Sequence, residues 1–388
     1  MAKSKTSEYV PQEEEAKAIS DDNARLSSIL KENKDQHYNY HERVTWKVST
    51  GSLLLDVAIG GYLSPCLVRV CGNFNEGKTP ETLEIVRNFL TTVPNSKCFW
   101  VIAEGRGLSK ENQERCGLKF IYKPEDWEVG TVFVLESNVF ELFIKCVKDA
   151  VLNNPNNIKY CFVVDSIDGL MLKDDRQKEI EEANKVAGTP ALSKKMLQSL
   201  SLGMFKFGHL MILLSQVTAE IKLDKYQRSP NRGGEFSGGN SLLHGSDWIF
   251  EYQKTGYNDD FILDNPSGKL NDGKSKPIGK WAKVMVQKSA LEASRKQLVQ
   301  YPIKYGKKPS GIWIEYEIAD LLLGWELIKK KTAWLTFNEN VVKEAKEKGL
   351  ELQEQHQGMD NLRKYLEANP PITEYFYNRF KAVLANES

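Results

Sequence analysis

The stretch Gly72-Asn73-Phe74-Asn75-Glu76-Gly77-Lys78-Thr79 matches the phosphate-binding loop pattern G-x-x-x-x-G-K-[ST] at every fixed position. In this pattern the glycines let backbone N–H groups converge on phosphate oxygens, the lysine neutralises the β- and γ-phosphates, and the threonine hydroxyl ligates Mg²⁺. An apolar run over residues 66–71 precedes the loop, and residues 83–90 carry apolar side chains at helical spacing after it. A strand, a loop and a helix in this order predict a nucleoside triphosphate site with the phosphates at the helix N-terminus.

Composition limits the other functions that the chain could have. It has 388 residues, 53 basic against 52 acidic, and a net charge of +1, so a nucleic-acid site would have to be a local patch. Its 6 cysteines are scattered without a C-x-x-C pair, which favours reduced core residues over a disulfide or zinc framework. The sequence shows no signal peptide and no apolar run as long as a membrane span. We expect a soluble, cytoplasmic protein with no membrane partner.

The periodicity of the chain predicts an α/β fold. Strand-like runs alternate with helical segments between residues 46 and 303, which is typical of a mainly parallel sheet with crossover helices. The strand-like runs cover residues 66–71, 98–103, 132–135, 160–165 and 210–215. We expect an ATPase-like core over 46–303, and a small α+β C-terminal domain over 304–388 that ends in a helix-rich piece.

The N-terminal 45 residues form a predicted tail and helix. Residues 1–18 are polar, and Ile19, Leu26, Ile29 and Leu30 mark a short amphipathic helix capped by Ser20 or Asp21. A thin apolar stripe either packs on the core of its own chain or docks on another subunit, and the sequence leaves both interpretations open.

Polar residues stand at the ends of strand-like runs, where ligands of such sheets bind. Asp165 ends one run and predicts a carboxylate that holds the water shell of a phosphate-bound Mg²⁺, although such a residue also caps helices. Glu104 follows another run and is either the base that deprotonates the attacking water or part of a surface salt bridge. Gln216 follows a third run, and its amide could sense the γ-phosphate.

The segment between Gln216 and Gly238 combines cations, aromatics and glycines. Cations bind phosphates, aromatics stack on bases and glycines give mobility, so the segment predicts a loop that binds single-stranded DNA. A solvated surface loop is the other interpretation. The residues that we assign to DNA here are Lys222, Lys225, Tyr226, Arg228 and Arg232.

A weaker DNA-binding signal lies around residues 173–189. Arg176, Lys178 and Lys185 are basic there, but several acidic residues offset them. Lys194 and Lys195 open the following helical segment and could also face phosphates.

Taken in order, these pieces resemble the RecA-type recombinase family, which includes bacterial RecA and phage enzymes such as UvsX. The resemblance covers most of the chain, and far fewer proteins share this ordered set than share the phosphate loop alone. It rests on residues 49–61 before the loop, Ala103-Glu104, residues 163–166, Ser215-Gln216, the run Gly238-Gly239-Asn240-Ser241-Leu242, and blocks 305–334 and 361–370 in the C-terminal region.

The resemblance implies a DNA-dependent ATPase that uses ATP and Mg²⁺, forms a helical homo-oligomeric filament on single-stranded DNA and exchanges strands with a homologous duplex. It also implies that Gly238, Gly239 and Asn240 flank a DNA-binding loop and that Lys288 reaches the nucleotide of a neighbouring subunit. If the chain is phage-encoded, its location would be the host cytoplasm.

The chain departs from the family at several positions. Ser109 and Asn112 stand where the family has an aspartate and a tyrosine that hold adenine, and Val286 replaces the second trans-acting lysine. Two other functions therefore remain open: a helicase or motor ATPase built on the same core, and a recombination mediator that does not hydrolyse ATP.

Overall fold

The computed structural model describes residues 13–105, 108–175, 188–218, 235–236, 239–254, 261–265, 267–270, 273–306 and 311–387. The chain divides into two compact units, Met1–Arg43 and Val44–Ser388. We describe each unit by itself.

The first unit contains helix α1 (Glu13–Glu32) and the short 3₁₀ helix η1 (Lys34–Gln36). The helix begins earlier than the sequence pattern predicts, so Ser20 and Asp21 lie inside it and the predicted cap is wrong. The apolar stripe starts only at Ile19, but the alanines, glutamates and lysine before it are strong helix formers and extend the helix toward the N-terminus. Leu26 and Ile29 are exposed, so the docking interpretation of this helix stays a prediction.

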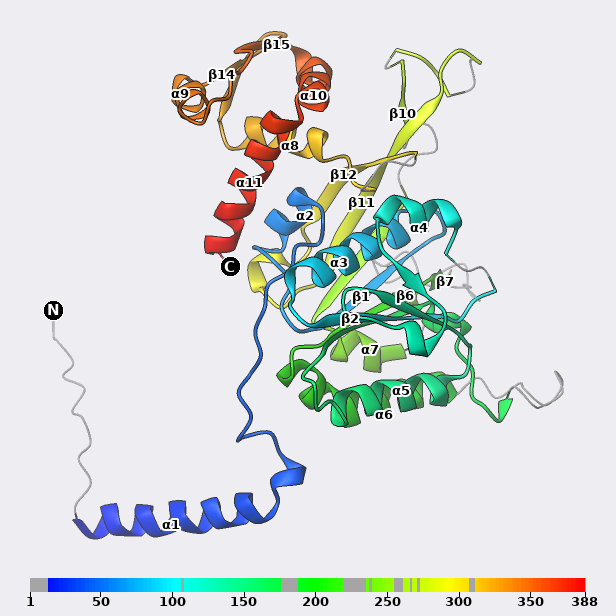
Figure 1. The fold of residues 1–388 in the computed structure, drawn as a ribbon, viewed down its shortest axis with the longest axis vertical. Helices are drawn as coiled ribbons and strands as arrows, with labels where there is room; N and C mark the ends of the chain where they lie inside the picture. Colours follow the sequence, from blue (N-terminus) through cyan, green and yellow to red (C-terminus); the bar gives the residue numbers. More distant parts are fainter. Residues whose placement is uncertain are drawn as a thin grey trace, which may run out of the picture. The chain divides into compact units, whose positions relative to one another are not determined.

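A large sheet dominates the second unit (Figure 1). Among the described residues it contains ten strands in the order β10-β11-β9-β1-β6-β5-β2-β4-β3, with β12 paired to β11. Strands β9, β1, β6, β5, β2, β4 and β3 are parallel, whereas β10, β11 and β12 add an antiparallel edge. The strands are β1 (Leu67–Gly72), β2 (Ser96–Ile102), β3 (Phe120–Ile121), β4 (Val132–Glu136), β5 (Lys159–Asp165), β6 (Leu210–Ser215), β9 (Trp248–Gln253), β10 (Phe261–Leu263), β11 (Pro277–Lys288) and β12 (Leu298–Lys304). The predicted α/β class and the predicted strands are confirmed.

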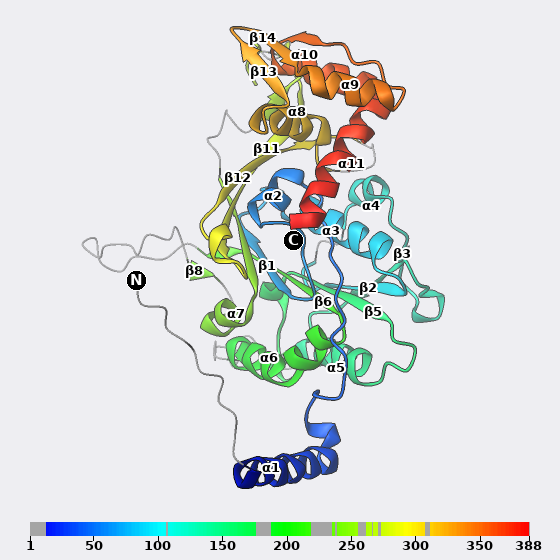
Figure 2. The same cartoon turned by 90° about the vertical axis from the view of Figure 1, so that its left-hand side faces the viewer.

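Helices cover both faces of this sheet because side chains along each strand alternate between two cores. In β2, for example, Trp100 joins the core under α2 and α3, whereas Phe99 and Val101 join the core under α5 and α6. Figure 1 and Figure 2 show α3 on one face and α5 and α6 on the other. The helices on these faces are α2 (Leu53–Ala58), α3 (Lys78–Thr92), α4 (Lys110–Cys116), α5 (Phe140–Leu152), α6 (Gly188–Lys206) and α7 (Gly239–Gly245).

The residues after β12 form a mixed α and β region with a core of its own. Its three-stranded antiparallel sheet has the order β13-β14-β15, and Phe376 and Phe380 are fully buried in its core. The elements are α8 (Ile314–Gly324), β13 (Ile328–Lys331), β14 (Trp334–Phe337), α9 (Glu339–Glu347), β15 (Gln355–Gln357), α10 (Gly358–Ala368) and α11 (Pro370–Glu387). A further small sheet pairs β7 (Val217–Thr218) with β8 (Glu235–Phe236), and the short 3₁₀ helices are η2 (Pro124–Asp126), η3 (Ile167–Gly169) and η5 (Glu292–Ser294).

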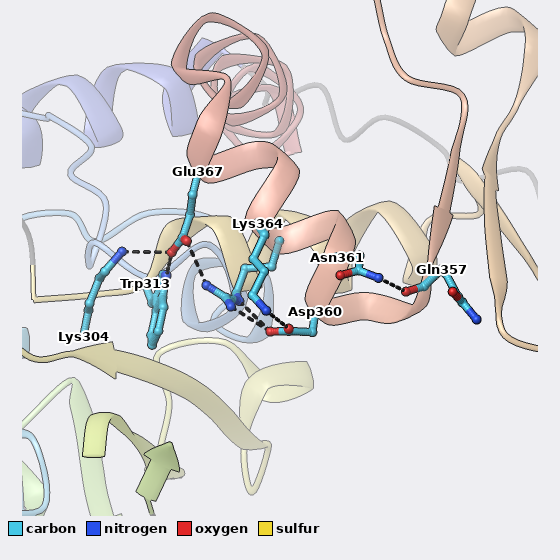
Figure 3. Close-up of polar contacts among 8 residues, drawn as sticks. Lys304, Trp313, Gln357, Asp360, Asn361, Lys364 and Glu367 are labelled. Atoms are coloured by element: carbon cyan, nitrogen blue, oxygen red, sulfur yellow. Dashed lines mark hydrogen bonds and ion pairs between the residues drawn. The ribbon is translucent and has the colours of Figure 1, made fainter. Parts of the chain in front are cut away.

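An ion-pair network joins α10 to β12 (Figure 3). The carboxylate of Glu367 accepts hydrogen bonds from Lys304 Nζ at 2.9 Å and from Trp313 Nε1 at 2.5 Å. Arg363 pairs with Glu367 at 2.9 Å and lies 4.9 Å from the centre of the Trp313 ring. These ion pairs and the contact with the Trp313 ring hold the C-terminal half of α10 against the end of β12.

In the part of the chain that the structure describes, no helix is both long and apolar enough to cross a membrane.

Buried carboxylates near α2 make the stability of the second unit depend on pH. Asp56 accepts hydrogen bonds from Ser49 and Thr50, and Glu317 accepts them from Ser52 Oγ and the Leu53 backbone. Burial raises the pKa of Asp56 from 3.8 to about 7 and the pKa of Glu317 from 4.5 to about 8. Both folded-state pKa values lie above the unfolded ones, so the free energy of unfolding falls as the pH rises from about 4 toward 8. We expect a loss of about 1 kcal/mol per pH unit for each carboxylate in its titration range.

Urea denaturation at pH 6.5 and at pH 8 measures this effect. This window limits the opposing contribution of His209 to a few tenths of a kcal/mol, about RT ln 2, because burial lowers the pKa of His209 to about 3 and its unfolded form is half neutral at pH 6.5 and almost fully neutral at pH 8. Glu317→Gln should flatten the dependence, since an amide does not titrate. If the parent has the same free energy of unfolding at both pH values, Asp56 and Glu317 do not have raised pKa values in the folded protein.

Candidate nucleotide-binding site

The phosphate-loop motif connects the end of β1 to the start of α3. Gly72 has a backbone φ of 146° and Gly77 has one of 104°, and residues that carry a side chain rarely adopt such values. A Cβ at Gly72 would lie 2.5 Å from the Tyr252 carbonyl oxygen, and one at Gly77 would lie 2.6 Å from Ile303. The two motif glycines are therefore required by backbone shape and by the close approach of neighbouring strands.

Lys78 is the first residue of α3 and folds back over the loop. Its Nζ donates to the carbonyl oxygens of Gly72 at 2.5 Å and Asn73 at 2.6 Å. Burial lowers the pKa of Lys78, while the nearby carboxylates raise it. The loop thus holds an ammonium group beside the backbone N–H groups at the start of a helix, which is an arrangement that attracts phosphate.

The strand order brings the polar strand ends together. β1, β6, β5 and β2 are consecutive in the sheet and parallel, so their carboxyl ends share one edge. Asp165 ends β5, Gln216 follows β6, and Glu104 follows β2 by two residues. All three side chains line the same pocket as Lys78 and Thr79.

Glu104 faces the pocket and is held by neutral hydrogen-bond donors. Gln216 Nε2 donates to Glu104 Oε1 at 3.2 Å, and the Ser166 hydroxyl donates to the same oxygen. This geometry connects the ends of β2, β5 and β6 through one carboxylate oxygen. A carboxylate that lines this pocket could accept a proton from a water that attacks the γ-phosphate.

Asp165 is a largely buried carboxylate of the pocket. Burial and the charge of Glu104 raise its pKa, Lys78 lowers it, and the net result is a pKa of about 6. A divalent cation would favour its ionised form. The Thr79 hydroxyl and the Asp165 carboxylate are oxygen donors of the type that Mg²⁺ prefers, and Mg²⁺ commonly takes few protein ligands because it also binds waters and phosphates.

The pocket has a volume of about 700 Å³, which is within the usual range for small-molecule sites. Besides the loop and the strand ends, it is lined by Leu108, Ser109, Asn112, Arg115, Phe261, Lys280 and Tyr305. Ser109 Oγ accepts the Asn112 N–H at the start of α4, and Asn112 Oδ1 accepts a hydrogen bond from Arg115 at 3.0 Å. Ser109 and Asn112, which the resemblance aligns with residues that hold adenine, thus both line the pocket.

Phe261, Lys280 and Tyr305 also line the pocket, although no sequence motif pointed to them as nucleotide-site residues. Phe261 pairs with Lys280 across β10 and β11, and Tyr305 follows β12. Lys280 Nζ lies 3.8 Å from Glu76 Oε2 and also donates to the Asn75 carbonyl of the phosphate loop. The long separation in sequence left no local signal, although Tyr305-Gly306 was already part of the family resemblance.

Lys288 lies on β11 and is not among the residues that line this pocket. Its Nζ donates to the carbonyl oxygens of Leu243 at 3.2 Å and His244 at 2.7 Å, in the last turn of α7. Within one subunit it therefore stabilises the C-terminus of α7. Its role toward a neighbouring nucleotide stays a prediction.

Most of the predicted DNA-binding residues lie outside the described residues. These are Arg176, Lys178, Lys185, Lys222, Lys225, Tyr226, Arg228, Arg232 and Gly238. Gly239 and Asn240 open α7, and Lys194 and Lys195 are exposed on α6.

Comparison with known proteins gives one consistent result. The chain is similar to RecA proteins. It is 23% identical to Protein RecA of Rickettsia prowazekii over 328 aligned residues. The aligned region covers 84% of this chain and 82% of that protein. It is 24% identical over 337 residues to Protein RecA of Bordetella avium, covering 86% and 81%, and 24% identical over 327 residues to that of Pseudomonas putida, covering 84% and 78%. No protein-family model matches the chain. The distant similarity supports the RecA resemblance of the motifs, and the likeness to phage enzymes stays a prediction.

Proposed function

We propose that this protein is a DNA-dependent ATPase that forms a helical filament on single-stranded DNA and exchanges strands with a homologous duplex. The observation that carries the proposal is the convergence of Lys78, Glu104 and Gln216 on one pocket, in a chain similar to RecA proteins over most of its length. Phosphate loops are common, but a carboxylate at the end of β2 that accepts a hydrogen bond from a glutamine at the end of β6, two strands away, is a more specific arrangement.

In this proposal each pocket residue has one task. Lys78 and the loop N–H groups bind the β- and γ-phosphates, and Thr79 and Asp165 would hold Mg²⁺, which neutralises charge that develops on the phosphates. Glu104 aligns and deprotonates the attacking water. Gln216 donates a hydrogen bond to Glu104. It also lines the pocket, where its amide would sense the γ-phosphate of the nucleotide.

The connection to DNA comes from the place of Gln216 in the chain. Gln216 is bonded to Glu104 and directly precedes the segment whose cations and aromatics predict DNA binding. A change in the nucleotide state at Glu104 would therefore be transmitted to this segment through one residue. This coupling favours an ATPase that responds to DNA over a mediator that does not hydrolyse ATP.

Neutralising Arg228 and Arg232 together should reduce the salt dependence of single-stranded DNA binding. Each cation that contacts a phosphate releases counterions, so the slope of log K against log salt should fall by about 0.7 for each lost contact. Tyr226→Ala should instead weaken binding by about 1–3 kcal/mol with little change in slope, because base stacking releases no counterions. Fluorescence anisotropy with an oligonucleotide in ATP, over a salt series, measures both quantities. Parental affinity and slope in both variants would assign DNA binding to other residues, first Arg176, Lys178, Lys194 and Lys195.

Electron microscopy combined with a strand-exchange assay tests the proposed function. The protein, ATP, single-stranded circles and a homologous linear duplex should give helical filaments and joint molecules, because head-to-tail contacts that do not close generate helices. Closed rings without joint molecules would indicate a helicase or motor ATPase. DNA binding without ATP hydrolysis or joint molecules would indicate a mediator.

A further inference from the structure

Asp168 is a carboxylate beside the pocket to which the proposed function gives no role. It lies in η3, directly after β5, and is not among the residues that line the pocket. Its Oδ2 accepts the backbone N–H of Gln216 at 2.6 Å and lies 3.4 Å from the Ser166 hydroxyl. Both of these partners also donate to Glu104. Asp168 therefore contacts the two residues whose side chains donate to Glu104, and is not itself part of the pocket lining.

The backbone that carries Asp168 packs closely on the residue before Glu104. Ile167 is buried, and a Cβ on Gly169 would lie 2.6 Å from the Ala103 carbonyl oxygen. The 3₁₀ helix η3 thus lies against the backbone just before Glu104. The hydrogen bond from the Gln216 N–H to Asp168 therefore connects the end of β6 to the segment that carries Glu104.

A buried arginine contacts the residue before Gln216. Arg69 in β1 is fully buried, and its Nε donates to the Ser215 hydroxyl at 3.2 Å. Burial lowers the pKa of Arg69, and the charges of Cys71 and Asp168 raise it. Two successive residues at the end of β6 are therefore held by charged groups, the Ser215 side chain by Arg69 and the Gln216 main chain by Asp168.

We propose that Asp168 is a positioning residue for hydrolysis, which holds Gln216 so that its side-chain amide orients Glu104. This inference rests on the proposed ATPase function. A hydrogen bond to a charged acceptor is stronger than one between neutral groups, and small errors in the position of a base reduce turnover strongly. Because Asp168 does not line the pocket, it acts on turnover through the geometry of Glu104.

The kinetic test uses the full chain with saturating single-stranded DNA. Asp168→Ala should lower kcat for ATP by roughly 10- to 100-fold, with KM within about twofold of the parent. Asp168→Asn keeps a side-chain oxygen that accepts the Gln216 N–H, so it should recover kcat to within about threefold of the parent. Asp126→Ala is the matched control, because Asp126 is an exposed aspartate in η2, another 3₁₀ helix, and should behave as the parent.

A double variant separates positioning from a general structural role. If Asp168 acts through the Gln216 side chain, Asp168→Ala should lower kcat by at most about twofold in a Gln216→Ala background. Independent, multiplicative effects of the two substitutions would overturn the inference, as would parental kcat in Asp168→Ala or a raised KM with unchanged kcat. These outcomes leave the proposed function standing if the parent hydrolyses ATP with DNA. A parent that binds ATP without hydrolysing it would refute the proposed function and the positioning role together.

Discussion

Glu104→Gln is expected to bind ATP as the parent does and to lose turnover by roughly 10²- to 10⁴-fold. The amide has nearly the same shape as the carboxylate and keeps one oxygen that can accept from Ser166 and Gln216, but it cannot take a proton from water. Equilibrium binding of a fluorescent ATP analogue and single-turnover hydrolysis with DNA separate the two effects.

Glu136→Gln is the matched control for this variant. Glu136 is the partner of Ile102 on the neighbouring strand β4, so it lies at the same edge of the sheet, but it does not line the pocket. We expect parental turnover for Glu136→Gln. Parental DNA-stimulated turnover in Glu104→Gln would show that Glu104 is not the base.

Lys78→Ala should abolish both tight ATP binding and hydrolysis. The substitution removes the ammonium group that the loop holds at the carbonyls of Gly72 and Asn73, and with it the positive charge at the phosphates. Loss of one such group at a reacting centre costs about 10²- to 10³-fold in turnover, to which the weakened binding is added. The same binding and hydrolysis assays measure the variant.

Lys119→Ala provides the comparison, because Lys119 is an exposed lysine that pairs with Glu128 away from the pocket. It should bind and hydrolyse ATP normally. If Lys78→Ala binds the analogue with parental affinity, the loop does not hold the phosphates in the way that we propose.

The sequence alone predicted the parts of the fold and site that local chemistry controls. Residues 160–165 form an apolar run that ends in an aspartate, and β5 has nearly these bounds and this end. The phosphate loop is encoded by contiguous residues with strong backbone requirements, so Gly72, Gly77 and Lys78 could be placed before the structure. Parallel pairing then placed Glu104, Asp165 and Gln216 at one edge.

The sequence could not predict features that depend on tertiary contacts. Lys280 reaches the phosphate loop only because β11 is antiparallel to β9 and β10, and no local pattern specifies that pairing. Asp168 has the sequence context of an ordinary turn residue, and only the folded structure places the Gln216 N–H beside its carboxylate. The start of α1 was missed because helix propensity rather than apolar periodicity extends it to Glu13.

Steady-state ATP hydrolysis by the full chain, with and without single-stranded DNA, tests whether this protein is a DNA-dependent ATPase. We expect DNA to raise the rate clearly above the basal rate, and Glu104→Gln to lose the stimulated rate while still binding DNA in ATP. A parent whose ATP hydrolysis is the same with and without single-stranded DNA would contradict the proposed function.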